Sequence, residues 1–172
     1  MNIIIQLIGG LGIVASIIAF QCKKHNTILF FRTLNEAIFA LQYFLLGAYT
    51  GMAMNIVGCV RNIIFTKLII KNKKTTSITI FFGIIFTLFG ICTWQGLKSV
   101  LIIIAKVLST IAYGNKNTTI IRVIIFITST SWLIYNYYAF SIAGVLCETF
   151  TIISLIIGII KLDVIPALIQ KR

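Results

Sequence analysis

The sequence predicts an all-α integral membrane protein with seven transmembrane helices, and three observations support this prediction. The 172-residue chain is 59% hydrophobic and 10% charged, whereas soluble domains are about 45–50% apolar and about 25% charged. Its mean hydropathy is +1.07. A membrane-spanning helix needs about 20 apolar residues, and stretches close to that length recur between short polar or basic breaks. The composition therefore excludes a soluble globular domain.

The breaks define the expected spans. The segments QCKKHNT at 21–27, KNKKTTS at 71–77 and GNKNT at 114–118 interrupt the apolar sequence, and shorter turns separate the other stretches. The predicted spans are residues 3–20, 28–46, 51–70, 78–93, 99–113, 119–138 and 142–160. Because the first cation, Lys23, follows the first apolar stretch, residues 3–20 are expected to be a retained helix and not a signal peptide.

The net charge of +12 predicts how the chain is oriented in the membrane. Nine of the 15 Lys and Arg residues lie in the loops after the first, third and fifth spans and in the tail, and only Lys98 lies in the alternate loops. Since Lys and Arg favour the cytoplasmic side, we expect the N-terminus outside and the C-terminus in the cytoplasm. Nucleic acid is therefore not an expected partner. The five remaining cations, which are expected to reach the span ends with their long side chains, are Arg32, Arg61, Lys67, Lys106 and Arg122.

An internal repeat is predicted from residues that recur about 93 positions apart. Residues 14–20 align with 107–113, and Gly51 and Asn55 align with Gly144 and Glu148. Each copy holds three spans, so one linker span is needed to give both copies the same orientation. The expected organisation is a first three-helix repeat at 1–77, a linker helix at 78–97, a second repeat at 98–160 and a short cytoplasmic tail at 161–172. Parallel repeats of this kind occur in transporters.

This 3+1+3 arrangement resembles the SWEET sugar transporters and the PQ-loop carriers. Their first repeat helix is similar to residues 8–21, but position 20 is Phe where their motif has the hinge Pro, and the second copy reads Tyr113-Gly114. A closer resemblance, over nearly the whole chain, is to the YgjV family of bacterial inner-membrane proteins. It rests on LLGAYTG at 45–51, Asn55, RN at 61–62, ST at 129–130, WLIYN at 132–136, Ser141, Gly144 and Glu148. This resemblance implies the fold and a bacterial inner-membrane location, and it implies no substrate.

Polar side chains inside spans are the candidate functional residues, because placing them in a membrane is costly. Asn55 and Glu148 occupy equivalent positions in the third helix of each repeat, and Trp132 and Asn136 share one face of the sixth span with Ser129. Asn55, Glu148, Trp132 and Asn136 are therefore the predicted lining of a solute pathway. The alternatives are an interhelical hydrogen bond for Asn55, and for Trp132 a packing role in an interfacial aromatic belt with the neighbouring tyrosines.

The other charged groups in the spans receive simpler predictions. Glu148 is expected to pair with Arg61 or Arg122, or to be protonated and couple transport to protons. Glu36 is expected to pair with Arg32 one turn earlier on the same helix. A second polar stripe, Lys106 with Ser109 or Thr110 and with Tyr113, runs along the fifth span, with Lys106 directed outward.

Catalytic and metal chemistry are not expected. The sequence has no HExxH, GxSxG or P-loop pattern, so neither an enzyme nor a cofactor is predicted. His25 has no second ligand nearby, and the four widely spaced cysteines (Cys22, Cys59, Cys92 and Cys147) are interpreted as small hydrophobic residues. The glycosylation pattern at 117–119 falls on the predicted cytoplasmic side and is discarded.

Two functions remain. The first is a transporter of a small neutral or polar solute through the repeat interface, which the paired Asn55 and Glu148 positions favour. The second is a non-transporting membrane scaffold or partner-binding protein with the same architecture, which the missing hinge prolines favour. The lipid bilayer is the expected environment in both cases. The sequence specifies no substrate, coupling ion, direction of transport or oligomeric state.

Overall fold

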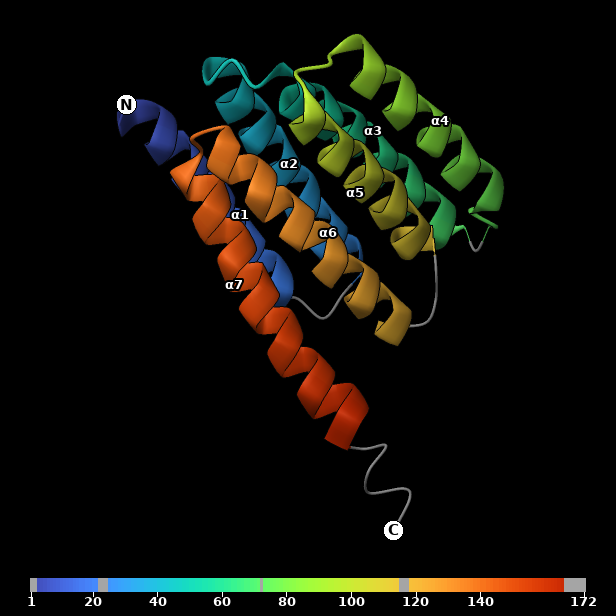
Figure 1. Ribbon diagram of the computed structural model, residues 1–172. Coiled ribbons are helices and arrows are strands. Elements are labelled where there is room, and N and C mark those ends of the chain that lie inside the picture. Colours follow the sequence, from blue (N-terminus) through green and yellow to red (C-terminus); the bar gives the residue numbers. More distant parts are fainter. Residues whose placement is uncertain (1–2, 22–24, 72, 115–117, 166–172) are drawn as a thin grey trace.

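The chain is described by a computed structural model that covers residues 3–21, 25–71, 73–114 and 118–165, and every regular element in these ranges is a helix (Figure 1). The helices are α1 (Ile3–Gln21), α2 (His25–Leu45), α3 (Tyr49–Ile70), α4 (Thr76–Cys92), α5 (Leu97–Gly114), α6 (Thr118–Tyr138) and α7 (Ile142–Ile159). A short π-helical turn, η1 (Ile160–Val164), directly continues α7.

Each predicted span coincides with one of the seven helices in the described residues, and the ends agree within three residues. The largest difference is at α2, which begins at His25 and not at residue 28, because a helix can continue through polar residues that an apolar span excludes. The chain stays helical through Ile165, so the first residues of the expected tail are helical.

Three of the described helices, α3, α5 and α7, are long enough and apolar enough to cross a membrane. The apolar parts of α1 and α4 are shorter. The more polar α2 and α6 occupy the middle of the packing. In the arrangement shown in Figure 1, α2 packs between α1 and α3, and α6 packs between α5 and α7. Contacts of α1 with α7 and of α3 with α5 join the two groups, and α4 packs on α3 and α5.

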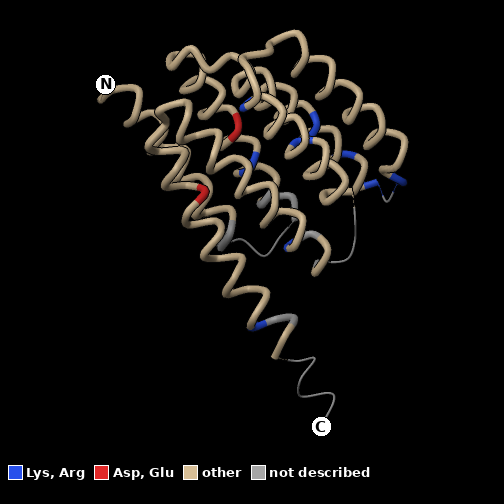
Figure 2. The backbone as a smooth tube through the Cα atoms, viewed as in Figure 1, with Lys and Arg blue, Asp and Glu red and all other residues tan. Residues whose placement is uncertain are grey.

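The distribution of polarity is the reverse of that in a soluble protein. Large apolar side chains such as Leu7, Leu11, Ile80 and Ile153 are exposed on the outer surface. Charged and amide side chains lie inside, and Figure 2 shows cationic and acidic segments within the bundle. The buried polar and charged set includes Asn35, Glu36, Gln42, Asn55, Arg61, Asn62, Lys106 and Asn136. An apolar exterior around a polar interior fits a lipid environment, where polar side chains face the bundle interior.

The turns between α2 and α3 and between α6 and α7 have the same backbone geometry. The N–H of Ala48 donates to the carbonyl of Tyr43 at 2.8 Å, and the N–H of Ser141 donates to the carbonyl of Asn136 at 3.0 Å. The residue before each donor has a positive φ, +69° at Gly47 and 54° at Phe140. A residue in this left-handed region commonly ends a helix and is usually glycine. The second turn therefore carries a bulky side chain where the first has the favoured residue.

This difference predicts opposite effects of two substitutions. Gly47→Ala forces a Cβ into the left-handed region and should lower the free energy of unfolding by about 1 kcal/mol. Phe140→Gly removes such a Cβ, and because the Phe140 side chain is largely exposed, it should raise stability. Thermal unfolding of both variants in detergent checks the signs. Equal shifts in the same direction would contradict the assignment of strain to these two turns.

Candidate functional site

A cavity of about 50 Å³ lies among α2, α3, α5, α6 and α7. A water molecule needs roughly 10–15 Å³ of such space, so the cavity has room for a few waters. Its wall is polar and aromatic, with amide groups, hydroxyl groups and both signs of charge. A polar cavity of this kind inside a bundle with an apolar exterior is the strongest candidate site in the described residues.

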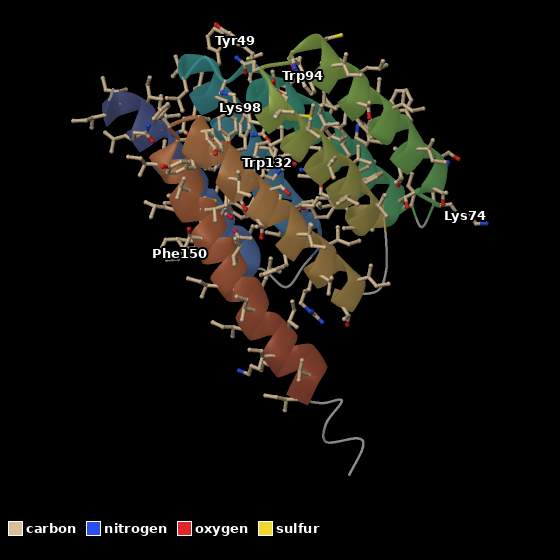
Figure 3. All side chains as sticks on the ribbon, in the orientation of Figure 1. Tyr49, Lys74, Trp94, Lys98, Trp132 and Phe150 are labelled. Atoms are coloured by element: carbon tan, nitrogen blue, oxygen red, sulfur yellow. The ribbon has the colours of Figure 1, made fainter. Side chains whose placement is uncertain are left out.

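All four residues predicted to line a solute pathway line this cavity: Asn55 from α3, Glu148 from α7, and Trp132 and Asn136 from α6. Asn55, Trp132 and Asn136 are buried, and Glu148 is half-buried. Figure 3 labels Trp132 on α6, and this residue is only 9% exposed. Its neighbours Tyr137 and Tyr138 are strongly exposed and do fit an interfacial belt.

The main correction to the sequence prediction concerns Glu36. Its Oε1 atom accepts from Arg61 Nη2 at 3.2 Å and from Lys106 Nζ at 3.0 Å, and no ion pair with Arg32 is present. Arg32 instead donates to the Tyr113 hydroxyl at 2.7 Å. Arg61 and Lys106 come from α3 and α5, so Glu36 connects three helices and is not part of a local pair on α2. We call Glu36, Arg61 and Lys106 the charge triad.

The sequence predicts that the side chains of Arg61 and Lys106 reach the ends of their spans. They lie in the interior instead. Arg61 is fully buried and Lys106 is 3% exposed. Arg61 Nη1 donates to Ser109 at 3.2 Å and to Thr110 at 3.0 Å, and its Nη2 donates to Asn62 at 2.9 Å. With these bonds and the Glu36 carboxylate, the guanidinium has the partners that a buried cation requires.

Gly58 on α3 provides the space for the triad. A Cβ at this position would overlap the Glu36 carboxylate and would lie 2.8 Å from Lys106 Nζ. Glycine in a helix interior is less stable than alanine by roughly 1 kcal/mol, so its presence here reflects a steric requirement. A small residue is also required on α1, where a Cβ on Gly12 would lie 2.7 Å from the Phe39 ring.

Two hydrogen bonds join pairs of cavity-lining side chains toward opposite ends of α2. Near the end of α2, the Tyr43 hydroxyl donates to Asn136 Oδ1 at 2.5 Å. Nearer its beginning, Arg32 reaches Tyr113 at the end of α5. We call these contacts the Tyr43 latch and the Arg32 latch. Each joins side chains from two different helices.

The Tyr43 latch belongs to a larger polar network. The N–H of Gly51 donates to the Tyr135 hydroxyl at 2.9 Å, and the Ser141 hydroxyl donates to Gln42 Oε1 at 2.9 Å. These bonds tie α6 to the start of α3, and α2 to the start of α7. Because such groups have no water to bond with in a membrane, they bond to one another.

The surface of the Trp132 ring is already in contact with other side chains. Tyr43 stacks on it with centroids 6.0 Å apart and an interplanar angle of 16°, and Lys106 Nζ lies 5.4 Å from its centroid. The indole thus packs against the triad and the latch. The ring therefore has little free face to offer a solute. Its fluorescence should change when the contacts in the cavity wall change.

Glu148 has no ion pair within the described part of the chain. Arg61, one of its two predicted partners, is bonded to Glu36. Ser129 on α6 also lines the cavity and is a neighbour of Glu148. The predicted polar stripe on α5 contributes three residues to the cavity wall, Lys106, Ser109 and Tyr113. Lys106 therefore points inward and not in the outward direction that the sequence predicts for it.

Several other predictions concern cysteine and metal chemistry. Cys59, Cys92 and Cys147 are free thiols, and the described residues contain no group of three His, Cys, Asp or Glu side chains that could hold a metal ion. Cys22, the His25 side chain and Asn117 lie outside the described residues.

Sequence reasoning missed Arg32, Glu36 and Tyr43 as cavity residues. A signal for Glu36 was present: the chain has only three acidic residues, and five cations lie within or near spans. When carboxylates are so few, one that pairs with more than one buried cation is expected. Nothing in the sequence pattern singled out Tyr43, because its partner Asn136 is 93 residues away.

Comparison with known families identifies a match over most of the chain. The family model Imp-YgjV, described as a bacterial inner membrane protein, matches residues 3–164. Searches among curated proteins and among solved structures found no match.

Removing the charge of Glu36 should destabilise the protein strongly. Glu36→Gln leaves Arg61 and Lys106 buried without an anion, and breaking a buried ion pair in this way costs about 3–5 kcal/mol. The matched control is Glu148→Gln, whose carboxylate has no ion pair in the described residues, and it should have a smaller effect. Thermal unfolding in detergent measures both. Equal melting temperatures for Glu36→Gln and the unmodified protein would show that the triad does not stabilise the fold.

Adding one methyl group at Gly58 should have a similar effect. Gly58→Ala displaces the Glu36 carboxylate or Lys106, and it should lower the melting temperature although alanine favours a helix. Gly83→Ala on α4 is the control, because a Cβ there has nothing within 4 Å; it should be neutral or stabilising by up to about 1 kcal/mol. A stabilising effect at Gly58 would mean that the triad does not need this space.

Proposed function

Because the chain belongs to the Imp-YgjV family of bacterial inner membrane proteins, we propose that it moves a small polar solute across that membrane through the cavity between its helices. Asn55, Glu148, Trp132 and Asn136 line the path, as the sequence predicts. The observation that carries the proposal is the cavity itself, which places charged and amide groups inside a bundle whose exterior is apolar. Such groups are costly in a membrane and commonly mark substrate pathways.

The two latches support alternating access. A transporter must open its site to one side at a time, which requires a breakable contact at each end. The Tyr43 latch and the Arg32 latch lie at opposite ends of α2 and each consists of one hydrogen bond between helices. Breaking the neutral Tyr43 latch costs about 1 kcal/mol, and breaking the Arg32 latch, which involves a charged group, costs about 1.5–3 kcal/mol, so each end can open without unfolding the bundle. The charge triad between them remains intact in either state.

We assign the chain a 3+1+3 arrangement similar to that of the SWEET and PQ-loop transporters. The two matching turns support it, because their hydrogen bonds recur with an offset of 93 residues. The same offset relates Asn55 to Glu148 and Tyr43 to Asn136, and all four line the cavity. In this arrangement α4 is the linker, and α1–α3 and α5–α7 are the repeats. The latch between Tyr43 and Asn136 then joins equivalent positions of the two repeats.

The distribution of cations supports an orientation with the N-terminus outside and the C-terminus in the cytoplasm. Lys71, Lys73 and Lys74 are exposed at the α3–α4 connection, and Lys161 is exposed beyond the end of α7. Lys98 lies at the opposite end of α4 from Lys74, and Figure 3 labels both. By the positive-inside rule, the end bearing Lys74 faces the cytoplasm. The Tyr43 latch is then the outer one.

A membrane scaffold or partner-binding protein is the second candidate function. The observation that favours it is that α1 and α5 are uninterrupted helices, with no proline hinge at Phe20 or Tyr113. Without such a hinge, the repeats move only as rigid groups. A scaffold would use the same triad for stability and would leave the cavity without a solute.

Flux measurements in proteoliposomes test transport. Labelled glycine, glucose and methanesulfonate serve as a zwitterionic, a neutral and an anionic probe. We expect at least one probe to cross faster than in protein-free vesicles, and we expect Glu148→Gln to reduce that flux about tenfold or more, the loss of one hydrogen bond to a charged group. Thr87→Val, on the exposed face of α4, is the matched control and should leave flux unchanged.

The outcomes separate the two functions. Equal rates for all three probes with and without protein would overturn the transport proposal and favour the scaffold. Measurable flux that Glu148→Gln leaves unchanged would remove Glu148 from the pathway.

A further inference from the structure

The charges around the cavity divide into a group joined by ion pairs and a group that makes no ion pair in the described residues. Glu36 is bonded to both Arg61 and Lys106, so one anion is shared by two cations and the triad keeps an excess of positive charge. Arg32 and Glu148 also line the cavity. Within the described residues, neither has an ion pair, with each other or with any other side chain. The cavity wall therefore contains one cation and one anion that make no ion pair in the described residues.

Arg32 retains capacity to bind an anionic group. A guanidinium has five N–H donors in a planar fork, and the hydrogen bond that Arg32 makes within the described residues is the one to Tyr113. The fork matches a carboxylate, which it can bind with two parallel hydrogen bonds. The Arg32 side chain is only half-buried, so a group that enters the cavity can reach it.

Glu148 offers the complementary partner. Its carboxylate is half-buried on α7, beside Ser129, and it lines the same cavity. Isolated charges away from water are unfavourable unless they are paired. A solute that carries a positive and a negative group satisfies both Arg32 and Glu148. A neutral solute satisfies neither charge, and a simple ion satisfies only one.

The size and the aromatic wall restrict the solute further. The cavity of about 50 Å³ has space for only a few waters, so only the smallest organic solutes fit without a large rearrangement. The Trp132 ring is in contact with Tyr43 and Lys106, which leaves little aromatic surface for stacking a sugar ring. These limits favour a compact zwitterion over a carbohydrate.

We propose that the cavity binds a small zwitterion of the amino-acid class, such as glycine or alanine, with its carboxylate on Arg32 and its ammonium group on Glu148. The inference rests on the proposed transport function and names the substrate class of the same site. Asn35 and Asn55, which also line the cavity, supply amide groups for the remaining hydrogen bonds. No covalent step is involved.

Tryptophan fluorescence tests this assignment directly. The chain has two tryptophans, Trp132 in the cavity wall and Trp94, which is half-exposed at the α4–α5 connection, so Trp94→Phe leaves Trp132 as the only indole. We titrate this variant in detergent with glycine, glycinamide, methanesulfonate and glucose. Glycine should change the emission of Trp132 at the lowest concentration. Calorimetric titration with the same probes provides a readout that does not depend on the indole.

Two neutralising variants make the prediction specific. Glu148→Gln should weaken glycine binding about tenfold or more and make the anion methanesulfonate the preferred probe. Arg32→Gln should weaken glycine binding similarly and make the cation glycinamide preferred. Neither residue belongs to the charge triad, and Glu148→Asp and Arg32→Lys, which keep the charges, should retain part of the glycine affinity.

The results distinguish failure of the substrate class from failure of the function. If glucose or methanesulfonate binds and crosses proteoliposomes while glycine does neither, the zwitterion assignment is overturned and transport stands. If no probe binds and none crosses, both the assignment and the transport proposal fail. If glycine binds and the neutralising variants do not change the order of preference, Arg32 and Glu148 are not its partners.

Discussion

The buried carboxylate of Glu36, shared by Arg61 and Lys106, is the interaction on which the interior depends. It joins α2, α3 and α5 at distances of 3.2 and 3.0 Å. Charges in a membrane interior are tolerated only when they are paired and hydrogen-bonded, and here one anion serves two cations. Gly58 leaves the space they occupy, and Ser109, Thr110 and Asn62 complete the bonds of Arg61.

The triad also explains why a cavity exists beside it. Once Glu36 is committed to Arg61 and Lys106, Arg32 lacks the partner that its position on the same helix suggested, and it bonds to Tyr113 instead. Glu148 in turn lacks Arg61. Two charges of opposite sign are thus left facing one space between α2 and α7. The few charged residues of this apolar chain therefore form both the stabilising triad and the charged wall of the candidate site.

Much of the candidate site could be predicted from sequence, for identifiable reasons. Asn55 and Glu148 could be identified because polar residues in spans are rare and because the apparent repeat relates the two positions. Trp132 and Asn136 could be identified because they share a helix face with Ser129. Tyr43 had no such signal, and Glu36 was paired with the nearest cation along the helix. That choice followed a rule for isolated helices, which a buried interior overrides when partners from neighbouring helices offer more bonds.

The sequence alone determined the fold class, the membrane environment and the positions of seven helices, because these depend on local hydropathy and on how many apolar residues span a bilayer. The tertiary structure alone decided which charges are paired. The partners of Glu36 lie 25 and 70 residues away, and the Tyr43 latch joins residues 93 apart. Such pairings depend on how each helix is rotated and which neighbour it faces. Packing of the whole bundle sets both, and hydropathy along the chain does not record them.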